Sequence, residues 1–276
     1  MTVKEINGNI EIHGLNNFAL RDTLDCGQAF RWREVSSDCF EGFAYNKFLR
    51  IGFKDNCFIL YNTSIEDFEN IWKNYFDIER DYGEIISGFS DNPILKAASE
   101  FACGIRILKQ EPWEALCSFI ISQNNNIPRI KGIIERLCEN FGKKDASGYF
   151  SFPTPEKIAT LSLTDLQVLR SGFRAKYILD AAKKVADGTI QLEKLRGLDT
   201  DTARQELMKI YGVGAKVADC TLLFGLGHLN AFPKDVWIKR ALESLCDGIL
   251  PECTKGYEGI AQQYIFHYAR ITKLKV

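Results

Sequence analysis

Lys216 and Asp235 are the two side chains whose type and position in the sequence best support chemistry. Lys216 opens a predicted helix directly after the glycine pair Gly212 and Gly214. The positive end of a helix dipole disfavours an ammonium ion there, and a lysine must be a neutral amine to act as a nucleophile. Asp235 follows Pro233 at the start of another predicted helix, where a carboxylate caps the helix and can face the same site. The pair predicts an amine nucleophile assisted by a carboxylate, although a plain helix cap explains the aspartate alone equally well.

The turn Gly212-Val213-Gly214 between two predicted helices also suits the binding of a phosphate group. Glycines let the backbone turn tightly and approach another molecule, and the second helix presents unpaired N–H groups at its start. Those groups bind phosphate oxygens without basic side chains, which suits a chain with a net charge of −1. For a glycine pair considered alone, a tight turn without a ligand is the more common explanation.

These residues lie in the second of two parts of the chain that differ in their hydrophobic pattern. In the first part, short runs rich in aromatic and β-branched residues alternate with polar turns. This pattern predicts antiparallel strands at 40–45, 48–53 and 58–62. Later segments repeat apolar residues at helical spacing. We therefore predict an α+β fold, with a small antiparallel sheet domain and its helices at 1–108, then a larger all-helical domain at 109–276. The glycine turn and its two helices occupy about 201–226.

Composition places the chain among ordinary globular proteins, with 276 residues, 46% hydrophobic and 26% charged. A chain of this length can bury a core without disulfides or a structural metal, which excludes a disordered chain and a cysteine-stapled scaffold. Nine cysteines are spread singly, and residues 1–12 contain no apolar signal segment. We therefore expect reduced thiols in a cytoplasmic protein, with no segment long enough to cross a membrane.

Charge is distributed unevenly between the two parts. Residues 1–108 hold 11 Lys or Arg and 17 Asp or Glu, whereas residues 109–276 hold 24 and 19. Binding to nucleic acid depends on a local basic surface and not on the mean charge. The helical part is therefore compatible with a polyanionic partner.

Five segments, taken in order along the chain, resemble the motifs of the helix-hairpin-helix DNA glycosylase superfamily and most closely those of the 8-oxoguanine DNA glycosylases. The segments are CGQAFRW (26–32), SQNNNIPRI (122–130), GFRAKY (172–177), GVGAKVADC (212–220) and AQQYIF (261–266). The resemblance implies a base-excision repair enzyme that removes 8-oxoguanine from double-stranded DNA and then cleaves the strand as an AP lyase.

By this resemblance, the damaged base is flipped into a protein pocket. It lies there between Cys220 and Phe266, and Gln262 reaches its Watson–Crick edge. The carbonyl of Gly27 accepts a hydrogen bond from N7–H, which 8-oxoguanine has and guanine lacks. A main-chain acceptor at that point therefore rejects the normal base.

The same resemblance makes Lys216 the nucleophile and Asp235 the catalytic carboxylate, with the hairpin at 212–214 on the DNA backbone. Phe173 is the wedge that holds the base stack apart. The orphaned partner base is read by three polar side chains, Asn124, Arg129 and Arg174. Better-known eukaryotic members usually have Tyr as the wedge and His two residues after the aspartate, where this chain has Phe173 and Trp237. The preferred opposite base is therefore not predicted.

We expect no resident cofactor. Cys246 and Cys253 have the spacing that opens an iron–sulfur loop in related glycosylases, but no cysteine follows them, so a four-cysteine cluster is not predicted. The histidines are too scattered to predict a zinc site: His13, His228 and His267. The resemblance allows a monovalent or divalent cation at the hairpin carbonyls. The expected partner is double-stranded DNA containing 8-oxoguanine, bound by a monomer away from any membrane.

Two other functions stay open at this point. The chain could be a glycosylase and lyase for another oxidised base, although the segment around Gly27 is a feature of enzymes for purine lesions by resemblance. It could instead be a hairpin module that binds the DNA backbone without catalysis. Backbone binding alone requires neither Lys216 nor Asp235, so the presence of both favours an enzyme.

Overall fold

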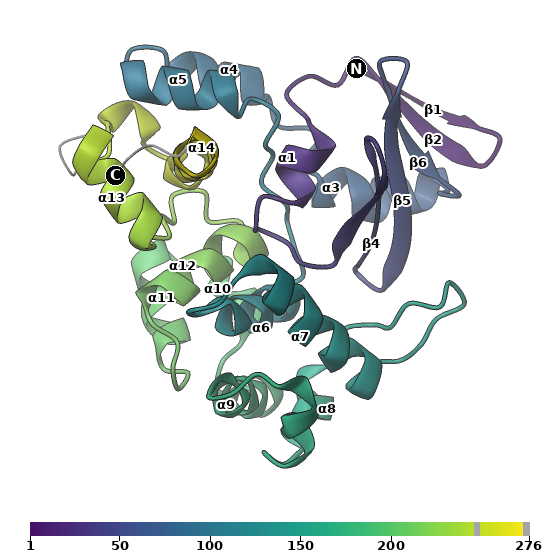
Figure 1. Cartoon of the computed structure of the whole chain (residues 1–276), viewed down its shortest axis with the longest axis vertical. Helices are drawn as coiled ribbons and strands as arrows, with labels where there is room; N and C mark the ends of the chain where they lie inside the picture. Colours follow the sequence, from purple (N-terminus) through teal and green to yellow (C-terminus); the bar gives the residue numbers. More distant parts are fainter. Residues whose placement is uncertain (246–248, 273–276) are drawn as a thin grey trace.

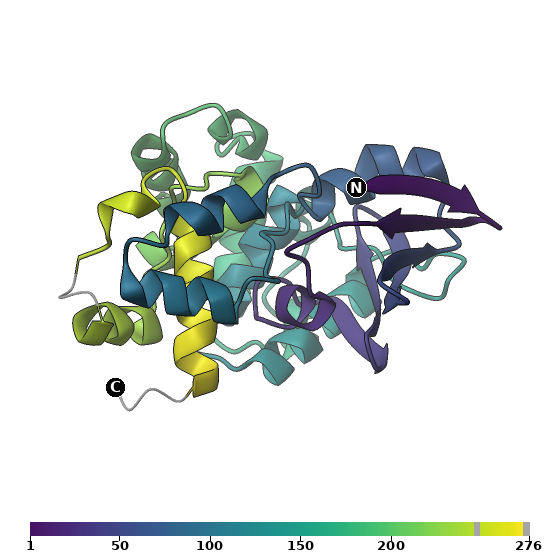
Figure 2. The same ribbon diagram turned by 90° about the horizontal axis from the view of Figure 1, so that it is seen from above.

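The structure, a computed structural model, describes residues 1–245 and 249–272. Strands near the N-terminus form one sheet, and most of the helices form a body beside it (Figure 1). Seen from above, the sheet lies at one end of the molecule and the helical body at the other (Figure 2). This arrangement confirms the predicted α+β class, with the sheet first in the sequence and the helices after it.

Neighbouring strands of the sheet run antiparallel in the order β1-β2-β6-β5-β4-β3. Their bounds are β1 Thr2–Ile6, β2 Asn9–His13, β3 Trp32–Ser36, β4 Cys39–Ala44, β5 Lys47–Lys54 and β6 Cys57–Tyr61. The three predicted strands are β4, β5 and β6. Their two connecting turns each place two residues at positive φ, namely Tyr45-Asn46 and Asp55-Asn56, as two-residue hairpins require.

One face of the sheet packs on short helices from the same part of the chain. These are α1 Leu20–Leu24, α2 Ile65–Asp67, the π-helical turn η1 Phe68–Trp72, and α3 Lys73–Tyr75. Ser64 begins α2 as predicted, because its hydroxyl accepts a hydrogen bond from the Asp67 N–H at 3.1 Å. Trp32, Trp72 and Tyr75 are almost fully buried between sheet and helices. The sheet therefore has a hydrophobic core of its own.

The helical body is built from α4 onward. Its elements are α4 Tyr82–Gly88, α5 Pro93–Phe101, α6 Pro112–Ser122, α7 Ile127–Phe141, α8 Pro155–Ala159, η2 Asp165–Leu169, α9 Arg174–Ala186, α10 Leu192–Leu195, α11 Thr200–Met208, α12 Ala215–Thr221, η3 Leu222–Leu226, α13 Val236–Leu245, η4 Glu252–Thr254 and α14 Glu258–Thr272. Four of these helices begin with a capping side chain followed by proline in the first turn, which satisfies free N–H groups and presets the helical φ. The caps are Asn92, Glu111, Asn126 and Thr154.

The two hydrophobic cores do not divide the chain at residue 108. Buried residues between 82 and 107 belong to the core of the helical body, where α5 packs against α14. Leu108, in contrast, belongs to the core under the sheet. The change of hydrophobic period near 108 thus marks where strands end in the sequence, whereas α4 and α5 already pack with the later helices. Within the part of the chain that the structure describes, no helix combines the length and apolar character needed to cross a bilayer.

Candidate active site

Side chains from distant parts of the chain meet around one small cavity between the N-terminal part and the helical body. Its lining comes from the turn before β3, from α6, from α12 and η3, from the turn before α13, and from α14. The residues are Cys26, Gly27, Phe119, Lys216, Cys220, Phe224, Pro233, Asp235, Gln262, Gln263 and Phe266. All six residues predicted for catalysis and the base pocket are among them, so the structure brings them together.

Lys216 lies in the first turn of α12, directly after the Gly214 cap, as the glycine pair predicts. Its Nζ donates to the Ser122 hydroxyl at 3.4 Å and lies 5.2 Å from the centroid of the Phe119 ring. The amine therefore points into the cavity between one hydroxyl and one aromatic face. Both neighbours come from α6, and neither was predicted as part of the site.

Cys220 lies one helical turn after Lys216 on the same face of α12 and is buried. Burial raises the pKa of the Cys220 thiol to about 11, although the nearby Lys216 opposes the shift. The thiol therefore stays neutral at physiological pH. It presents a small, polarisable surface on which a base can stack.

Asp235 caps α13, because its Oδ1 accepts a hydrogen bond from the Ile238 N–H at 2.8 Å. This contact confirms the cap that the sequence predicts and holds the carboxylate at the cavity wall. Among the described residues, no ion pair joins Asp235 to Lys216. The two groups line the same cavity.

Gly27 adopts a left-handed backbone with φ +98° at the edge of the cavity. A Cβ built there would lie 3.3 Å from Cδ1 of Ile127, so both the backbone conformation and the space favour glycine. The next residue, Gln28, is fully buried and holds this turn in place. Its Nε2 donates to the carbonyls of Thr23 and Arg106 at 2.9 and 2.8 Å, and its Oε1 accepts from the Leu108 N–H at 3.0 Å. Sequence reasoning missed this role of Gln28.

Two adjacent glutamines on α14 are buried at the cavity. Gln263 donates from Nε2 to Oε1 of Gln262 at 2.6 Å and accepts from the Cys26 thiol at 3.8 Å. Arg270, one turn beyond Phe266, lies 5.6 Å from that ring and donates to the Cys26 carbonyl at 3.4 Å. The residue expected to read the base edge is thus oriented by a neighbour, Gln263, that sequence reasoning did not single out.

The cavity has a volume of about 50 Å³, which holds a few water molecules and not a purine. Phe119 and Phe224 are buried, whereas Phe266 is partly exposed. Phe266 is therefore the aromatic wall that is free to move aside. Binding of a base requires such a movement.

The residues predicted to act on the opposite strand lie at the starts of α7 and α9. Asn124 and Arg129 are exposed, and Phe173 is 47% exposed just before α9. Arg174 differs from the expectation, because it is buried and its guanidinium already donates to the carbonyls of Gln123, Asn124 and Ser171. These bonds hold the loop before α7 in place, and the role of Arg174 on the opposite base stays a prediction.

The hairpin lies where predicted, between α11 and α12. Gly212 has φ +79°, Gly214 caps α12, and Val213 is buried between them. The carbonyl of Lys209 in this turn accepts a hydrogen bond from Lys184 Nζ at 2.7 Å. This carbonyl is therefore already paired with a cationic side chain. The cation allowed at the hairpin carbonyls stays a prediction.

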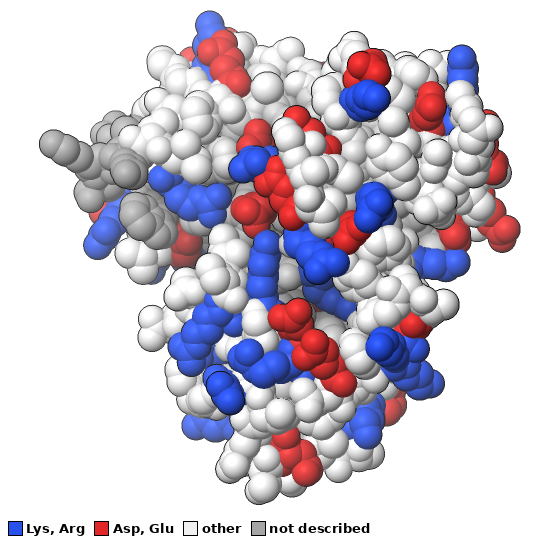
Figure 3. Space-filling view, turned by 45° about the vertical axis from the view of Figure 1, so that its right-hand side comes forward, with Lys and Arg blue, Asp and Glu red and all other residues white. Residues whose placement is uncertain are grey.

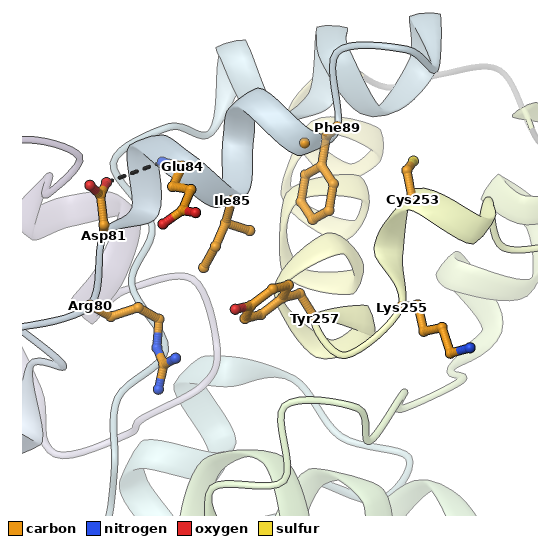
Figure 4. Close-up of a pocket in the computed structure, with 9 residues that line it drawn as sticks. Arg80, Asp81, Glu84, Ile85, Phe89, Cys253, Lys255 and Tyr257 are labelled. Carbon is orange, nitrogen blue, oxygen red and sulfur yellow. Dashed lines mark hydrogen bonds between the residues drawn. The ribbon is translucent and has the colours of Figure 1, made fainter.

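A larger cavity of about 560 Å³ lies elsewhere, between α4 and the turn after η4 (Figure 4). Two of its charged side chains, Arg80 and Asp81, make structural contacts. Asp81 caps α4 by accepting from the Glu84 N–H at 3.1 Å, and Arg80 pairs with Asp77 at 2.5 Å. None of the predicted site residues within the described ranges lines this cavity. Cys253, also at its rim, is exposed, whereas its predicted companion Cys246 and the side chain of Trp237 lie outside the described part.

Basic and acidic side chains are interspersed over the surface, but Lys and Arg gather around a hollow on one face and over the helical part next to it (Figure 3). A net charge of −1 therefore coexists with a local concentration of basic groups. Such a surface accommodates a polyanion without a strongly basic chain.

Comparison with known proteins decides the family. Residues 12–116 match the family described as "8-oxoguanine DNA glycosylase, N-terminal domain", and residues 117–249 match the "HhH-GPD superfamily base excision DNA repair protein". The chain belongs to the 8-oxoguanine DNA glycosylase family. The resemblance inferred from the five sequence motifs is thereby confirmed.

Relatives within this family include both curated sequences and solved structures. The N-glycosylase/DNA lyase of Saccharomyces cerevisiae is 41% identical over 152 residues, which cover 50% of this chain and 40% of the yeast protein. A probable N-glycosylase/DNA lyase of Methanothermobacter thermautotrophicus is 31% identical over 75% of each chain. The 8-oxoguanine glycosylase/lyase of Clostridium acetobutylicum, solved with double-stranded DNA containing cytosine opposite 8-oxoG, is 38% identical over 99% of each chain, with a TM-score of 0.93.

Proposed function

We propose that the protein excises 8-oxoguanine from double-stranded DNA and cleaves the resulting abasic site through a Schiff base on Lys216. The single observation that carries the proposal is the meeting of Lys216, Asp235, Gly27, Gln262 and Phe266 around one cavity. A nucleophile, a carboxylate and a base-reading wall occur there together. The Clostridium relative, an 8-oxoguanine glycosylase/lyase, shares the fold over nearly the whole chain.

Recognition begins with extrusion of the damaged nucleotide from the duplex. The exposed Phe173 ring fills the gap in the stack, and the hairpin at 212–214 holds the backbone with its N–H groups. Phe266 moves aside and then stacks on the base opposite Cys220. The orphaned base meets the exposed Asn124 and Arg129.

Discrimination against guanine rests on one main-chain acceptor. In 8-oxoguanine N7 carries a hydrogen and donates to the Gly27 carbonyl, whereas in guanine N7 presents a lone pair to the same oxygen. A buried acceptor facing an acceptor loses its hydrogen bond and pays desolvation. The turn must therefore be rigid, and the buried Gln28 supplies that rigidity through its three hydrogen bonds.

Catalysis uses the free amine of Lys216. Nζ attacks C1′ of the sugar as the bond from C1′ to the base breaks, and the base leaves with that electron pair and gains a proton. Opening of the sugar ring yields a Schiff base between Nζ and C1′. Loss of a proton from C2′ then expels the 3′ phosphate, and water releases the lysine. Asp235 stabilises the positive charge that develops on the sugar.

No cofactor is needed for this sequence of steps, and one chain supplies every group in it. We accordingly propose a monomer that acts on chromosomal DNA in the cytoplasm. A cation at the hairpin carbonyls would contribute only to the binding of the backbone.

Borohydride trapping on a duplex with one 8-oxoguanine tests the proposal. The reagent reduces the Schiff base and leaves a covalent protein–DNA adduct at Lys216. We expect an adduct with the lesion duplex and none with the undamaged duplex. An adduct that forms only with an oxidised pyrimidine would indicate the alternative lesion class, and no adduct with any damaged duplex would indicate a binding module.

A further inference from the structure

Helix α9 carries the proposed wedge at its N-terminus and contacts the hairpin along its side. The Phe173 ring packs edge-on against Tyr177, with ring centroids 5.6 Å apart and planes at 65°. The guanidinium of Arg174 lies 4.4 Å from the centroid of the same Phe173 ring. The exposed wedge is thus held by two neighbours from its own helix. One of them, Tyr177, also contacts the hairpin.

Tyr177 lies directly against the first glycine of the hairpin. A Cβ built on Gly212 would lie 2.5 Å from three carbons of the Tyr177 ring, so this ring occupies the space that any side chain at that position would need. Tyr177 also packs edge-on against Tyr211, with centroids 5.2 Å apart and planes at 82°. Phe173, Tyr177 and Tyr211 therefore form a continuous row of rings from the wedge to the hairpin.

Polar contacts hold the same two elements together. Asp180 accepts a hydrogen bond from the Tyr211 N–H at 2.7 Å and pairs with Lys184 at 2.9 Å. Lys184 donates in turn to the Lys209 carbonyl at 2.7 Å. Tyr177, Asp180 and Lys184 are spaced by three and four residues and so share one face of α9. The hairpin packs against that face of α9.

We propose that Tyr177 is a positioning residue that fixes the wedge Phe173 relative to the hairpin. When the hairpin binds the DNA backbone, the wedge is then held at the position where it enters the base stack. The inference rests on the proposed function, because it takes Phe173 as the wedge and residues 212–214 as the backbone contact. A wedge on a loose support would enter the stack at variable positions, and small displacements cost large factors in rate. The backbone N–H groups of the hairpin would still bind undamaged DNA.

The test compares Tyr177→Leu with Tyr177→Phe. Phenylalanine keeps the ring that touches both Phe173 and Gly212, whereas leucine removes it. Single-turnover excision of 8-oxoguanine is measured together with the fluorescence of a 2-aminopurine beside the lesion, which reports opening of the stack. We expect Tyr177→Leu to lower excision roughly 10- to 100-fold with a smaller fluorescence change. Tyr177→Phe should stay within about two-fold of wild type in excision, in the fluorescence change and in the binding of undamaged duplex. Tyr177→Leu should weaken that binding much less than it lowers excision.

A double-mutant cycle separates positioning from a merely structural role. If Tyr177 acts through the wedge, Tyr177→Leu adds little loss once Phe173→Ala has removed the wedge. Cleavage of a ready-made abasic site should also fall less than excision does. Should the leucine variant lose its fold by circular dichroism, Tyr177→Met replaces it in the same cycle, because the unbranched methionine side chain adapts to irregular spaces.

Three results would overturn the inference: full excision by Tyr177→Leu, an equal loss in Tyr177→Phe, or losses that multiply in the double variant. Failure of the proposed function is distinguishable from all three, because the wild-type protein itself would then release no 8-oxoguanine.

Discussion

Cys220 and Lys216 share one face of α12, and their different states decide which of them reacts. Burial raises the pKa of Cys220 to about 11, so the sulfur in the cavity wall is a thiol and not a competing thiolate nucleophile. Lys216 extends into the cavity beside Ser122 and Phe119. The amine is therefore the group that is placed to attack C1′.

Replacing Lys216 by Gln should abolish both base release and borohydride trapping. Glutamine has similar length but no nucleophilic amine, whereas the pocket, the wedge and the hairpin remain for binding. Gel-shift affinity for an 8-oxoguanine duplex should therefore change by less than about three-fold, well under the roughly 1.4 kcal/mol of a ten-fold change. Lys183→Gln, at an exposed position of α9, serves as the control and should keep full activity. Strand cleavage at the wild-type rate by the Lys216 variant would exclude the assignment.

Replacing Gly27 by Ala should slow excision of 8-oxoguanine by about ten-fold or more, since even a misplacement near 1 Å can cost 10²-fold. A Cβ at φ +98° strains the turn and lies close to Ile127. The strain shifts the Gly27 carbonyl to which the base is proposed to donate its hydrogen bond. Gly188→Ala is the matched control, since Gly188 also has positive φ (+78°) but open space around its Cβ. It should lower the thermal midpoint without changing the excision rate at 25 °C. Equal excision by the Gly27 variant and wild type would show that this turn does not contact the base.

Among the secondary-structure elements, the sequence predicted those with a clear local hydrophobic pattern and missed those whose position depends on contacts with distant residues. The strands β4, β5 and β6 carry runs of aromatic and β-branched residues, whereas β1 and β3 are edge strands with mostly exposed side chains and little pattern to detect. Helix α14 begins at Glu258, after Gly256 takes φ +86° beyond the short turn η4.

The same difference between local and long-range information applies to the candidate active site. Local signals placed Lys216 and Asp235 at helix starts, and family resemblance supplied the pocket residues. The contacts of Arg174 in the structure could not be predicted from its neighbours in sequence, because its guanidinium donates to carbonyls about 50 residues away. Gln28 and Gln263 were missed for a related reason: a buried glutamine reveals its role only through its partners in space. Sequence spacing carries no record of such partners.

Glu111 caps helix α6, which carries Phe119 and Ser122 at the active site. The stability of the folded protein should therefore depend on the ionisation of the Glu111 carboxyl. Burial raises the pKa of the Glu111 carboxyl to about 7, although the hydrogen bond from the Glu114 N–H opposes this shift. The folded state therefore holds a proton that the unfolded state loses near pH 4.5. Stability should fall as pH rises from about 4.5 to 7, where the unfolded chain binds fewer protons than the folded one.

The variant Glu111→Gln removes this titration. It should be more stable than wild type at pH 8 by about 2 kcal/mol and nearly equal to it at pH 4.5, as measured by urea unfolding at both values. A pH-independent difference between the two proteins would show that Glu111 is charged in the folded protein throughout this range.

For the whole molecule, the division into two cores explains where the active site lies. The cavity takes Cys26 and Gly27 from the N-terminal part and its remaining lining from the helical body. Gln28 bridges the two parts, since it bonds the segment at 106–108. The proposed site therefore lies where the two parts meet, and residues of both parts line it.

Charge over the whole surface leads to the last prediction, that binding of lesion DNA depends only modestly on salt. Residues 1–108 hold 17 acidic and 11 basic side chains, so the N-terminal part adds little attraction to phosphate. Basic and acidic side chains are interspersed on the face with the hollow (Figure 3). Several basic side chains of the helical part are paired within the protein. We expect hairpin and helix-start amides to make many of the backbone contacts, and amide contacts release few counterions.

Each neutralised phosphate contributes a slope of about −0.9 in the logarithm of the binding constant against that of salt concentration. We expect the total to correspond to roughly two to four phosphates, measured by fluorescence anisotropy on an 8-oxoguanine duplex between 50 and 200 mM salt, about the range in which such slopes are resolved. Lys183→Ala should leave the slope unchanged, because that side chain is exposed on α9. Lys184→Ala should weaken binding through the hairpin, since Lys184 holds the Lys209 carbonyl, again without a change of slope. A slope equivalent to about eight phosphates would instead mean that the basic side chains around the hollow contact the backbone directly.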